Sequence, residues 1–295
     1  MSGFFGSMEV HGGERLESQK LESPEAVEQE AKKPESVDAP ENGGQLDAAR
    51  IIKDDSGNEI NNGSELRAND TFIKHGIEYK TDDDSQIYSA DGHLRANTTY
   101  KLNGNIYTTD ENGRIIKCEA KPVRSPENPR DLEAQREAGH EDRRSNDQGG
   151  HIIGRDMNGD GGIGNLVAMD SKINQSDFKR MENDINVVVD DGKDVATKTQ
   201  IAYRDDSKRP DIITVTVTAD GKDYVYKFDN NLDGALRDRV PENGKETVQS
   251  RLYETGGEIS SIKEEYNKSG SVIETTVYIT YKGDDGKNYR ISALL

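Results

Sequence analysis

Stretches of alternating apolar and polar side chains, each broken by a glycine-containing turn, restrict the fold of this chain more than any other feature. Residues 211–228 alternate around a turn at Gly221, and residues 271–294 alternate around a turn at Gly286. Alternation with a period of two is typical of a half-buried strand, and Asp-Gly between two such runs indicates a tight hairpin. The sequence therefore predicts antiparallel β-hairpins.

An internal repeat adds two further hairpins. The segment HGIEYKTDDDSQIYSADG at 75–92 aligns with NGNIYTTDENGRIIKCEA at 103–120, so that Tyr79 matches Tyr107. Each unit has two short apolar runs on either side of a polar turn, which is the pattern of a hairpin. We expect a tandem hairpin repeat over residues 72–121.

Composition divides the chain into three parts. Residues 1–68 are rich in Glu, Ser, Pro, Gly and Lys and poor in aromatic side chains. Such a segment buries too little apolar surface to offset the entropy lost on ordering, so we expect a disordered acidic arm or linker. Residues 69–230 are expected to form the main domain, and residues 231–295 a β-hairpin extension.

Charge and cysteine content exclude several classes of protein. The formal net charge is −18, from 57 acidic and 39 basic side chains. A chain this acidic does not bind DNA through a general basic surface, so any nucleic-acid contact must come from a local Arg/Lys cluster or a metal ion. Cys118 is the sole cysteine, which excludes an internal disulfide and a cysteine-based zinc site.

The sequence carries neither a usual secretory signal nor a membrane span. Its first residues lack a basic region followed by a continuous apolar run, and no apolar stretch approaches the ~20 residues needed to cross a bilayer. We expect no membrane partner. The protein is expected to be cytoplasmic before export, or secreted by a route that needs no signal peptide.

Chemistry is concentrated in residues 147–182, DQGGHIIGRDMNGDGGIGNLVAMDSKINQSDFKRME. His151 follows two glycines, which allow a phosphate or a neighbouring strand to approach the backbone closely. Imidazole titrates near neutrality and can accept a proton from water. His151 is therefore a candidate general base; the alternative is a histidine hydrogen-bonded in a corner between strand and loop.

Two oxygen-bearing side chains follow on a predicted helix. Apolar residues at helical spacing predict a helix over 175–189, which together with the hairpins indicates an α+β fold. Asn174 directly precedes this helix and is either its N-cap or an oxygen ligand for Mg²⁺. Glu182 lies eight residues later and roughly 80° around a regular helix. It is either a solvated charge or a group that holds a hydrated ion.

A second constellation overlaps the first. Asp156, Asn158 and Asp160 have the spacing of the first ligands in an EF-hand-like calcium loop. The twelfth position is Val167, where a carboxylate is needed. A non-enzymatic, β-rich module that binds Ca²⁺ or a partner therefore stays open as an alternative.

Together these motifs resemble the ββα-metal (His-Me finger) DNA/RNA non-specific endonucleases. In that family a D-R-G-H motif supplies the base, and an asparagine that ligates Mg²⁺ opens a helix whose glutamate lies eight residues further on. The sequence is most similar to the type VII secretion, EssD-like nuclease-toxin branch. The branch motifs D-x-G-G-H-L-I, G-G-x-x-N-L-V-x-M-D-x-x-x-N and Y-T-T-D…G-R-I correspond to DQGGHII, GGIGNLVAMDSKIN and YTTDENGRI, within about residues 70–230.

The resemblance implies a fold, an ion and residue roles. The fold would be a ββα-metal core over 147–190 on an antiparallel sheet, and the ion Mg²⁺, with Mn²⁺ as a substitute. His151 would activate water, Asn174 would be the direct metal ligand, and Glu182 would order the hydrated ion. Asn165 would position the site or the scissile phosphate.

One departure from the family pattern concerns the arginine of D-R-G-H. The residues before His151 read Gln-Gly-Gly, so that arginine is absent. The candidates to replace it are Arg143, Arg144, Arg155 and Arg180. Of these, Arg155 is nearest in sequence to His151. An inactive, degenerate nuclease is therefore a further alternative.

The function expected from the resemblance is Mg²⁺-dependent cleavage of DNA or RNA without sequence specificity. In the toxin branch such a protein acts against competing bacteria and is neutralised in the producer by a cognate immunity protein.

Overall fold

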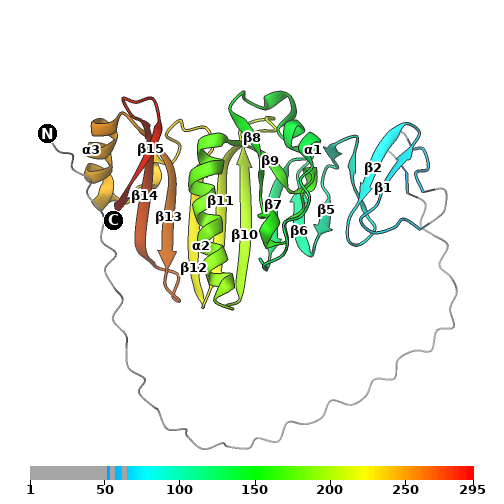
Figure 1. The fold of residues 1–295 in the computed structure, drawn as a ribbon, viewed down its shortest axis with the longest axis horizontal. Coiled ribbons are helices and arrows are strands. Elements are labelled where there is room, and N and C mark those ends of the chain that lie inside the picture. The colour runs from blue at the N-terminus through cyan, green and yellow to red at the C-terminus, as the bar shows by residue number, and fades with distance from the viewer. Residues whose placement is uncertain (1–51, 54–56, 62–64) are drawn as a thin grey trace, which may run out of the picture. The chain divides into compact units, whose positions relative to one another are not determined.

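A nine-stranded antiparallel sheet dominates the computed structural model, which describes residues 52–53, 57–61 and 65–295 (Figure 1). The strand order is β15-β14-β13-β12-β11-β10-β7-β6-β5, so neighbours in the sheet are mostly neighbours in sequence. Its strands are β5 (Thr99–Leu102), β6 (Asn105–Thr109), β7 (Ile115–Ala120), β10 (Val195–Tyr203), β11 (Pro210–Ala219), β12 (Lys222–Asp229), β13 (Glu258–Tyr266), β14 (Val272–Lys282) and β15 (Asn288–Leu294). The expectation of a mixed fold built mainly on antiparallel sheet is confirmed.

The two repeat units close their turns in the same way. The first unit forms a hairpin in a separate four-stranded sheet made of β1 (Thr71–Lys74), β2 (Ile77–Thr81), β3 (Ile87–Ala90) and β4 (His93–Leu94). Asp82 Oδ1 accepts hydrogen bonds from the backbone N–H groups of Asp84 and Gln86. In the second unit, the hairpin β6–β7, Asp110 Oδ1 accepts the equivalent pair of bonds. The shared aspartate thus explains why the repeat is visible in the sequence.

The first hairpin also packs against residues that precede it in the chain. Ile60 is buried against Tyr79 and Ile87, and Lys53 forms an isolated β-bridge with Glu59. Most of the arm expected over 1–68 lies outside the described residues, but ordered packing includes Ile60. The small cluster around Tyr79 therefore begins before residue 69.

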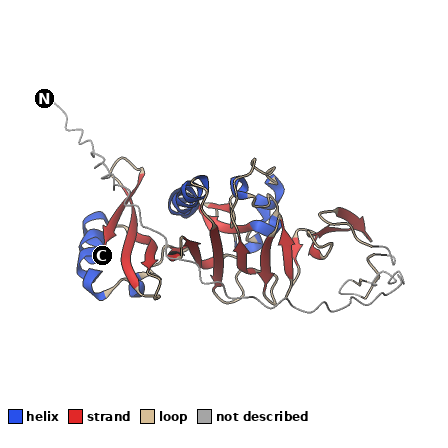
Figure 2. Cartoon of the chain, turned by 90° about the horizontal axis from the view of Figure 1, so that it is seen from below, coloured by secondary structure: helices blue, strands red, loops and turns tan. Residues whose placement is uncertain are grey.

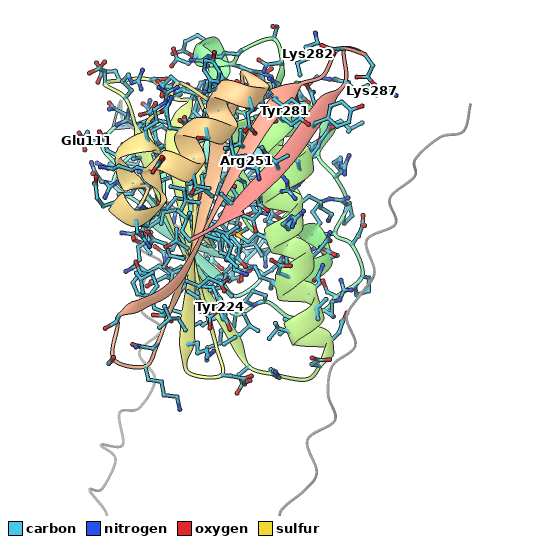
Figure 3. The ribbon with its side chains drawn as sticks, turned by 90° about the vertical axis from the view of Figure 1, so that its left-hand side faces the viewer. Glu111, Tyr224, Arg251, Tyr281, Lys282 and Lys287 are labelled. Carbon is cyan, nitrogen blue, oxygen red and sulfur yellow. The ribbon has the colours of Figure 1, made fainter. Side chains whose placement is uncertain are left out.

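Hydrophobic clusters cover opposite faces of the large sheet. Phe178 and Met181, on the helix formed by η4 (Ile173–Phe178) and α2 (Lys179–Asp190), pack in a cluster that includes Phe228 of β12. Phe228 pairs with Ser261 across the β12–β13 ladder, so Ile262 points to the opposite face. There it joins the cluster of α3 (Lys245–Thr255). Figure 3 accordingly shows α2 and α3 on opposite sides of β13–β15, and Figure 2 shows the helices packed against the strands.

The segment between the two later hairpins holds regular structure in addition to the β-hairpin expected within residues 231–295. It contains α3 and the strand β13, which joins the last hairpin to the main sheet. Alternation is hidden in β13 because Ser260, Ser261 and Glu264 are buried alongside its isoleucines. Residues 258–294 therefore continue the main sheet.

A further group of elements consists of α1 (Leu132–Glu137), the antiparallel pair β8 (Asp147–His151) and β9 (Leu166–Asp170), and the short helices η1 (His140–Asp142), η2 (Arg155–Met157) and η3 (Ile163–Asn165). The short helices η5 (Arg237–Arg239) and η6 (Glu242–Gly244) lie with α3, since Leu236 and Val240 belong to its hydrophobic cluster. Among the described residues, none of the helices has both the length and the apolar character that a membrane span requires.

Candidate active site

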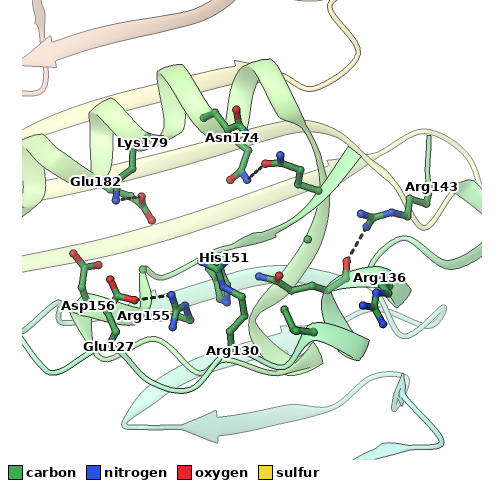
Figure 4. A pocket seen from close by; sticks show the side chains of 16 residues that line it. Glu127, Arg130, Arg136, Arg143, His151, Arg155, Asp156, Asn174, Lys179 and Glu182 are labelled. Atoms are coloured by element: carbon green, nitrogen blue, oxygen red, sulfur yellow. Dashed lines mark hydrogen bonds and ion pairs between the residues drawn. The ribbon is translucent and has the colours of Figure 1, made fainter. Parts of the chain in front are cut away.

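A cavity of about 640 Å³ opens between α1, the end of β8, the loop that follows β8, and the helix η4–α2 (Figure 4). Its lining is almost entirely polar. It comprises Glu127, Arg130, Leu132, Gln135, Arg136, Arg143, Gln148, Gly149, His151, Gly154, Arg155, Asp156, Asn174, Gln175, Lys179 and Glu182. The structure thus brings His151, Asn174, Glu182 and Arg155 to one cavity.

His151 ends β8 and lies in the middle of this cavity (Figure 4). The two glycines before it are required by close packing. A Cβ at Gly149 would lie 2.7 Å from the backbone of Gln135, and one at Gly150 would lie 2.8 Å from Met169 Cε. A side chain at either position would push α1 or β9 away from the strand that carries His151.

The imidazole of His151 is held in its neutral form. Burial lowers its pKa to about 4, and the nearby guanidinium groups of Arg155 and Arg130 add to the effect. Its Nε2 is buried and has no hydrogen-bond partner within the described part of the chain. At neutral pH the ring is therefore an uncharged group that can accept a proton, and no protein group competes for this nitrogen.

Asn174 does not cap the helix, contrary to one of the two roles expected for it. The helical backbone begins earlier, and Lys172 N–H donates to Asp170 Oδ1 at 2.9 Å, so Asp170 provides the cap. Asn174 lies inside the π-helical turn η4. A π-helical turn holds more residues than an α-helical turn, so each residue advances by less than ~100°. This reduces the angular offset between Asn174 and Glu182, and both side chains line the same cavity.

The amide of Asn174 has a defined orientation. Its Nδ2 donates a hydrogen bond of 2.7 Å to Gln148 Oε1 on β8. Its Oδ1 lies 3.2 Å from the point that a Cβ at Gly150 would occupy, directly beside the strand that ends at His151. Asn174 Oδ1 is therefore the amide atom that is free to contact a ligand.

Glu182 lies on α2, and its carboxylate is mostly buried. Burial raises its pKa, although Lys179 Nζ lies 3.1 Å from its Oε2 and opposes the shift. A Cβ at Gly154 would lie 3.0 Å from Glu182 Oε1 and 2.8 Å from Asp156 Oδ1, so two carboxylates converge on this corner. A cation placed here would relieve the cost of burying the charge.

Asn165 lies outside the cavity. Its side chain is fully buried and makes four hydrogen bonds, two with Ile153 and one each with Tyr107 and Asp160. Both amide atoms are thereby used, so Asn165 has no group left to contact a phosphate. It fixes the loop between His151 and β9, which is a positioning role at a distance from the chemistry.

Two of the four arginines considered for the missing motif arginine line the cavity, and both are engaged. Arg143 donates to three backbone carbonyls, those of Gln135, Ala138 and Asp147. Arg155 pairs with Glu127 at 2.7 Å and also donates to Asn128 O. Arg144 lies in a different hollow of the surface, and Arg180 stacks on the Tyr278 ring.

Arg130 and Arg136 line the same cavity and were not anticipated. Both are exposed, and neither makes a hydrogen bond or ion pair with any described residue. Their positions in a proline-containing loop and on the short helix α1 give no local signal of proximity to His151. The two arginines come close to His151 only because α1 packs on β8.

The residues of the calcium-like loop turn away from one another. Asp156 accepts from Arg124 and Asn186, Asn158 donates to the Asn103 carbonyl, and Asp160 caps the Gly162 N–H. Within the described ranges, no group of three or more His, Cys, Asp or Glu side chains is placed to hold an ion. The spacing of this loop serves a turn rather than a calcium shell.

A buried ion pair anchors β8 to the large sheet. Arg209 donates to both carboxylate oxygens of Asp147 at 2.7 and 2.9 Å, and both side chains are almost fully buried. Asn230 adds a second link, since it accepts from Asp170 N–H and donates to the Ala168 and Pro210 carbonyls. The aspartate of the D-Q-G-G-H motif is thus a structural anchor.

The donor set of the cavity suits a hard divalent cation. Mg²⁺ prefers oxygen ligands and takes few of them from a protein. Asn174 offers an oriented amide oxygen, and Glu182 offers a mostly buried carboxylate whose Oε2 contacts Lys179. These groups fit such an ion at the site.

Comparison with known proteins finds a family match over this site. Residues 96–221 match the family model of the DNA/RNA non-specific endonucleases. The matched segment carries His151, Asn174 and Glu182, together with every strand from β5 to β11.

A more specific likeness is to the type VII secretion system protein EssD of Staphylococcus aureus. The identity is 34% over 108 residues with EssD of strain USA300, and the same values hold for strains NCTC 8325 and Newman. The match covers 34% of this chain and 17% of the length of EssD.

Proposed function

We propose that this protein is a Mg²⁺-dependent endonuclease that hydrolyses phosphodiester bonds in DNA and RNA without base specificity. The observation that carries the proposal is the cavity itself, where a neutral His151 and the oriented Asn174 amide face unpaired arginines. In this proposal β8, β9 and η4–α2 form the ββα-metal core.

His151 acts as the general base. Its ring is neutral at physiological pH because its pKa is lowered to about 4. It therefore accepts the proton of an attacking water as the water oxygen bonds to phosphorus, the bond from phosphorus to the leaving oxygen breaks, and that oxygen takes a proton from solvent. The lowered pKa makes it a weak base and also keeps it unprotonated over a wide pH range. Asn165 and the Arg209–Asp147 pair hold the loop and strand on either side of it.

Arg130 and Arg136 bind the phosphate and offset the charge that develops on its oxygens. Their guanidinium groups are free to make bidentate contacts with phosphate, for which arginine is well suited. They therefore replace the arginine missing from the motif. A free cation at this position also argues against an inactive, degenerate site.

Asn174 and Glu182 would hold the Mg²⁺, with Mn²⁺ as a substitute. When bound, the ion supplies Lewis-acid stabilisation of negative charge on the phosphate and the leaving oxygen. The contact of 3.1 Å with Lys179 favours the charged form of the Glu182 carboxylate and opposes the rise in its pKa caused by burial.

Absence of base specificity follows from the lining residues. The cavity residues include arginines, amides and carboxylates, and none of them is Phe, Tyr or Trp. Proteins that grip unpaired bases use aromatic side chains as stacking surfaces. The groups available here recognise phosphate and sugar, which carry no direct sequence information.

The biological setting is proposed from the similarity to EssD. The protein acts as an antibacterial toxin that is exported by the type VII secretion route. A cognate immunity protein neutralises it in the producing cell.

The test is a nuclease assay on supercoiled plasmid DNA and on single-stranded RNA, with Mg²⁺ and with EDTA. We expect cleavage that requires the ion and that falls by about 10²–10⁴-fold in His151→Ala, the usual contribution of a general base. Gln175→Ala is the matched control, because Gln175 lines the same cavity without a catalytic role. Intact substrates with wild-type protein, or full activity in His151→Ala, would refute the proposal.

A further inference from the structure

Gln148 directly follows Asp147 and occupies the variable position of the branch motif D-x-G-G-H. Its backbone is fixed in the β8–β9 ladder opposite Met169, and its side chain lines the cavity. There its Oε1 accepts a 2.7 Å hydrogen bond from Asn174 Nδ2, which joins β8 to the π-helical turn.

This hydrogen bond decides which end of the Asn174 amide meets a ligand. An asparagine side chain carries an acceptor oxygen and a donor NH₂ group, and rotation about its last bond exchanges them. With Nδ2 held by an acceptor on β8, Oδ1 is the atom left to face a cation. The opposite rotamer would present two N–H groups, which repel a cation.

We propose that Gln148 is a positioning residue that makes Asn174 a metal ligand by accepting the hydrogen bond from its amide. The inference rests on the proposed function, because it concerns the same site. Groups that hold a metal ligand in orientation commonly change metal affinity by about 10–100-fold when they are removed.

Other groups near Asn174 do not perform this task. In the described part of the chain, the bond to Gln148 is the only side-chain hydrogen bond that Asn174 makes. On the other side, Gly150 leaves room for Oδ1, since a Cβ there would lie 3.2 Å from it. Gln148 and Gly150 thus act together, one by holding the nitrogen and the other by leaving space for the oxygen.

The test uses the difference between acceptor and donor side chains. Gln148→Glu keeps an acceptor, Gln148→Leu removes it, and Gln148→Lys replaces it with a donor. Gln175 provides matched controls, because it is an exposed glutamine that lines the same cavity next to Asn174. The variants Gln175→Glu, Gln175→Leu and Gln175→Lys introduce the same changes in charge and size without touching the hydrogen bond.

The measurement is Mn²⁺ binding to the full-length protein by titration calorimetry, without nucleic acid, together with thermal melting of each variant. We expect Gln148→Leu to bind Mn²⁺ about 10–100-fold more weakly than Gln175→Leu. Gln148→Lys should lose more affinity than Gln175→Lys, and Gln148→Glu should bind at least as tightly as Gln175→Glu. If Gln148→Leu fails to fold, Gln148→Met removes the strong acceptor at similar length.

Two results separate the failure of this inference from that of the proposed function. If wild type binds Mn²⁺ and Gln148→Leu binds it as tightly as Gln175→Leu, the positioning role is wrong and the nuclease proposal stands. If wild type neither binds Mn²⁺ nor cleaves nucleic acid, both proposals are wrong.

Discussion

The two halves of the cavity differ in how their side chains are held. On the half formed by β8 and the helix η4–α2, Gln148, Asn174 and Glu182 are fixed by hydrogen bonds to one another or to Lys179. On the half formed by α1 and the loop before it, Arg130 and Arg136 are exposed and without partners among the described residues. In the proposed function the first half is preorganised for an ion, whose coordination geometry is demanding. The second half is free to adjust to phosphates that arrive in different backbone conformations.

Asn174→Ala tests the preorganised half and should cause the largest loss of activity among these variants. Loss of the amide oxygen removes a ligand of the ion, whose stabilisation of developing charge is worth several kcal/mol. We expect kcat to fall by about 10³-fold, and Mg²⁺ to stop raising the melting temperature. Gln175→Ala should stay within about twofold of wild type, and equal activity of the two variants would contradict the assignment of Asn174.

Arg209→Ala tests how the preorganised half is anchored to the sheet. Removal of one partner from a buried ion pair leaves an uncompensated charge and costs about 3–5 kcal/mol of unfolding free energy. The control is Arg204→Ala, because Arg204 pairs with Asp211 and Asp233 while its side chain is 55% exposed. Such exposed pairs contribute about 0–1 kcal/mol. Urea unfolding should therefore separate the two variants clearly, and similar losses would show that the Asp147 anchor is unimportant.

Arg130→Gln tests the other half of the cavity, where the arginines are exposed. Loss of one charged hydrogen bond to phosphate is worth about 1.5 kcal/mol, so kcat/KM should drop by about tenfold with Mn²⁺ affinity unchanged. The dependence of log binding on log salt should become shallower by about one unit. Arg144→Gln, outside the cavity, is the control. A large loss of Mn²⁺ affinity in Arg130→Gln would mean that the two halves are not separable.

The smallest effect concerns pH. Since the pKa of His151 is lowered to about 4, the base stays unprotonated well below the ordinary histidine range. The kcat/KM of the free enzyme should therefore hold to about pH 5 and fall as the pH approaches 4. Arg130→Gln removes a positive charge that lowers this pKa, so the acidic limb should move to higher pH by a fraction of a unit. A limb near pH 6.5 in wild type would contradict the burial of His151.

Sequence reasoning identified the side chains that share short spacings with a known motif. His151, Asn174 and Glu182 belong to one continuous segment, and their convergence depends on two strands and a helix with strong local patterns. The hairpins around Gly221 and Gly286 were recognisable for the same reason, because turn chemistry and alternation are local.

Local sequence patterns could not predict the contacts that depend on tertiary packing. Arg130 and Arg136 approach His151 only through the docking of α1 on β8, and Arg209 reaches Asp147 from the loop that precedes β11. The burial of Asn165 was equally hidden, since an asparagine in a glycine-rich loop gives no sign that four partners surround it. Strand β13 was missed because polar side chains occupy its inward positions.

The π-helical turn around Asn174 is a local defect in an otherwise regular helix, and defects of this kind trade stability for activity. Deletion of a single residue such as Gln175 would let the segment wind as an ordinary α-helix with better hydrogen bonds. Asn174 would then lie seven residues before Glu182, about 20° from it around a regular helix, so the two side chains would stay on one face. The π-helical turn thus lets a spacing of eight residues do what a spacing of seven does in an ordinary helix.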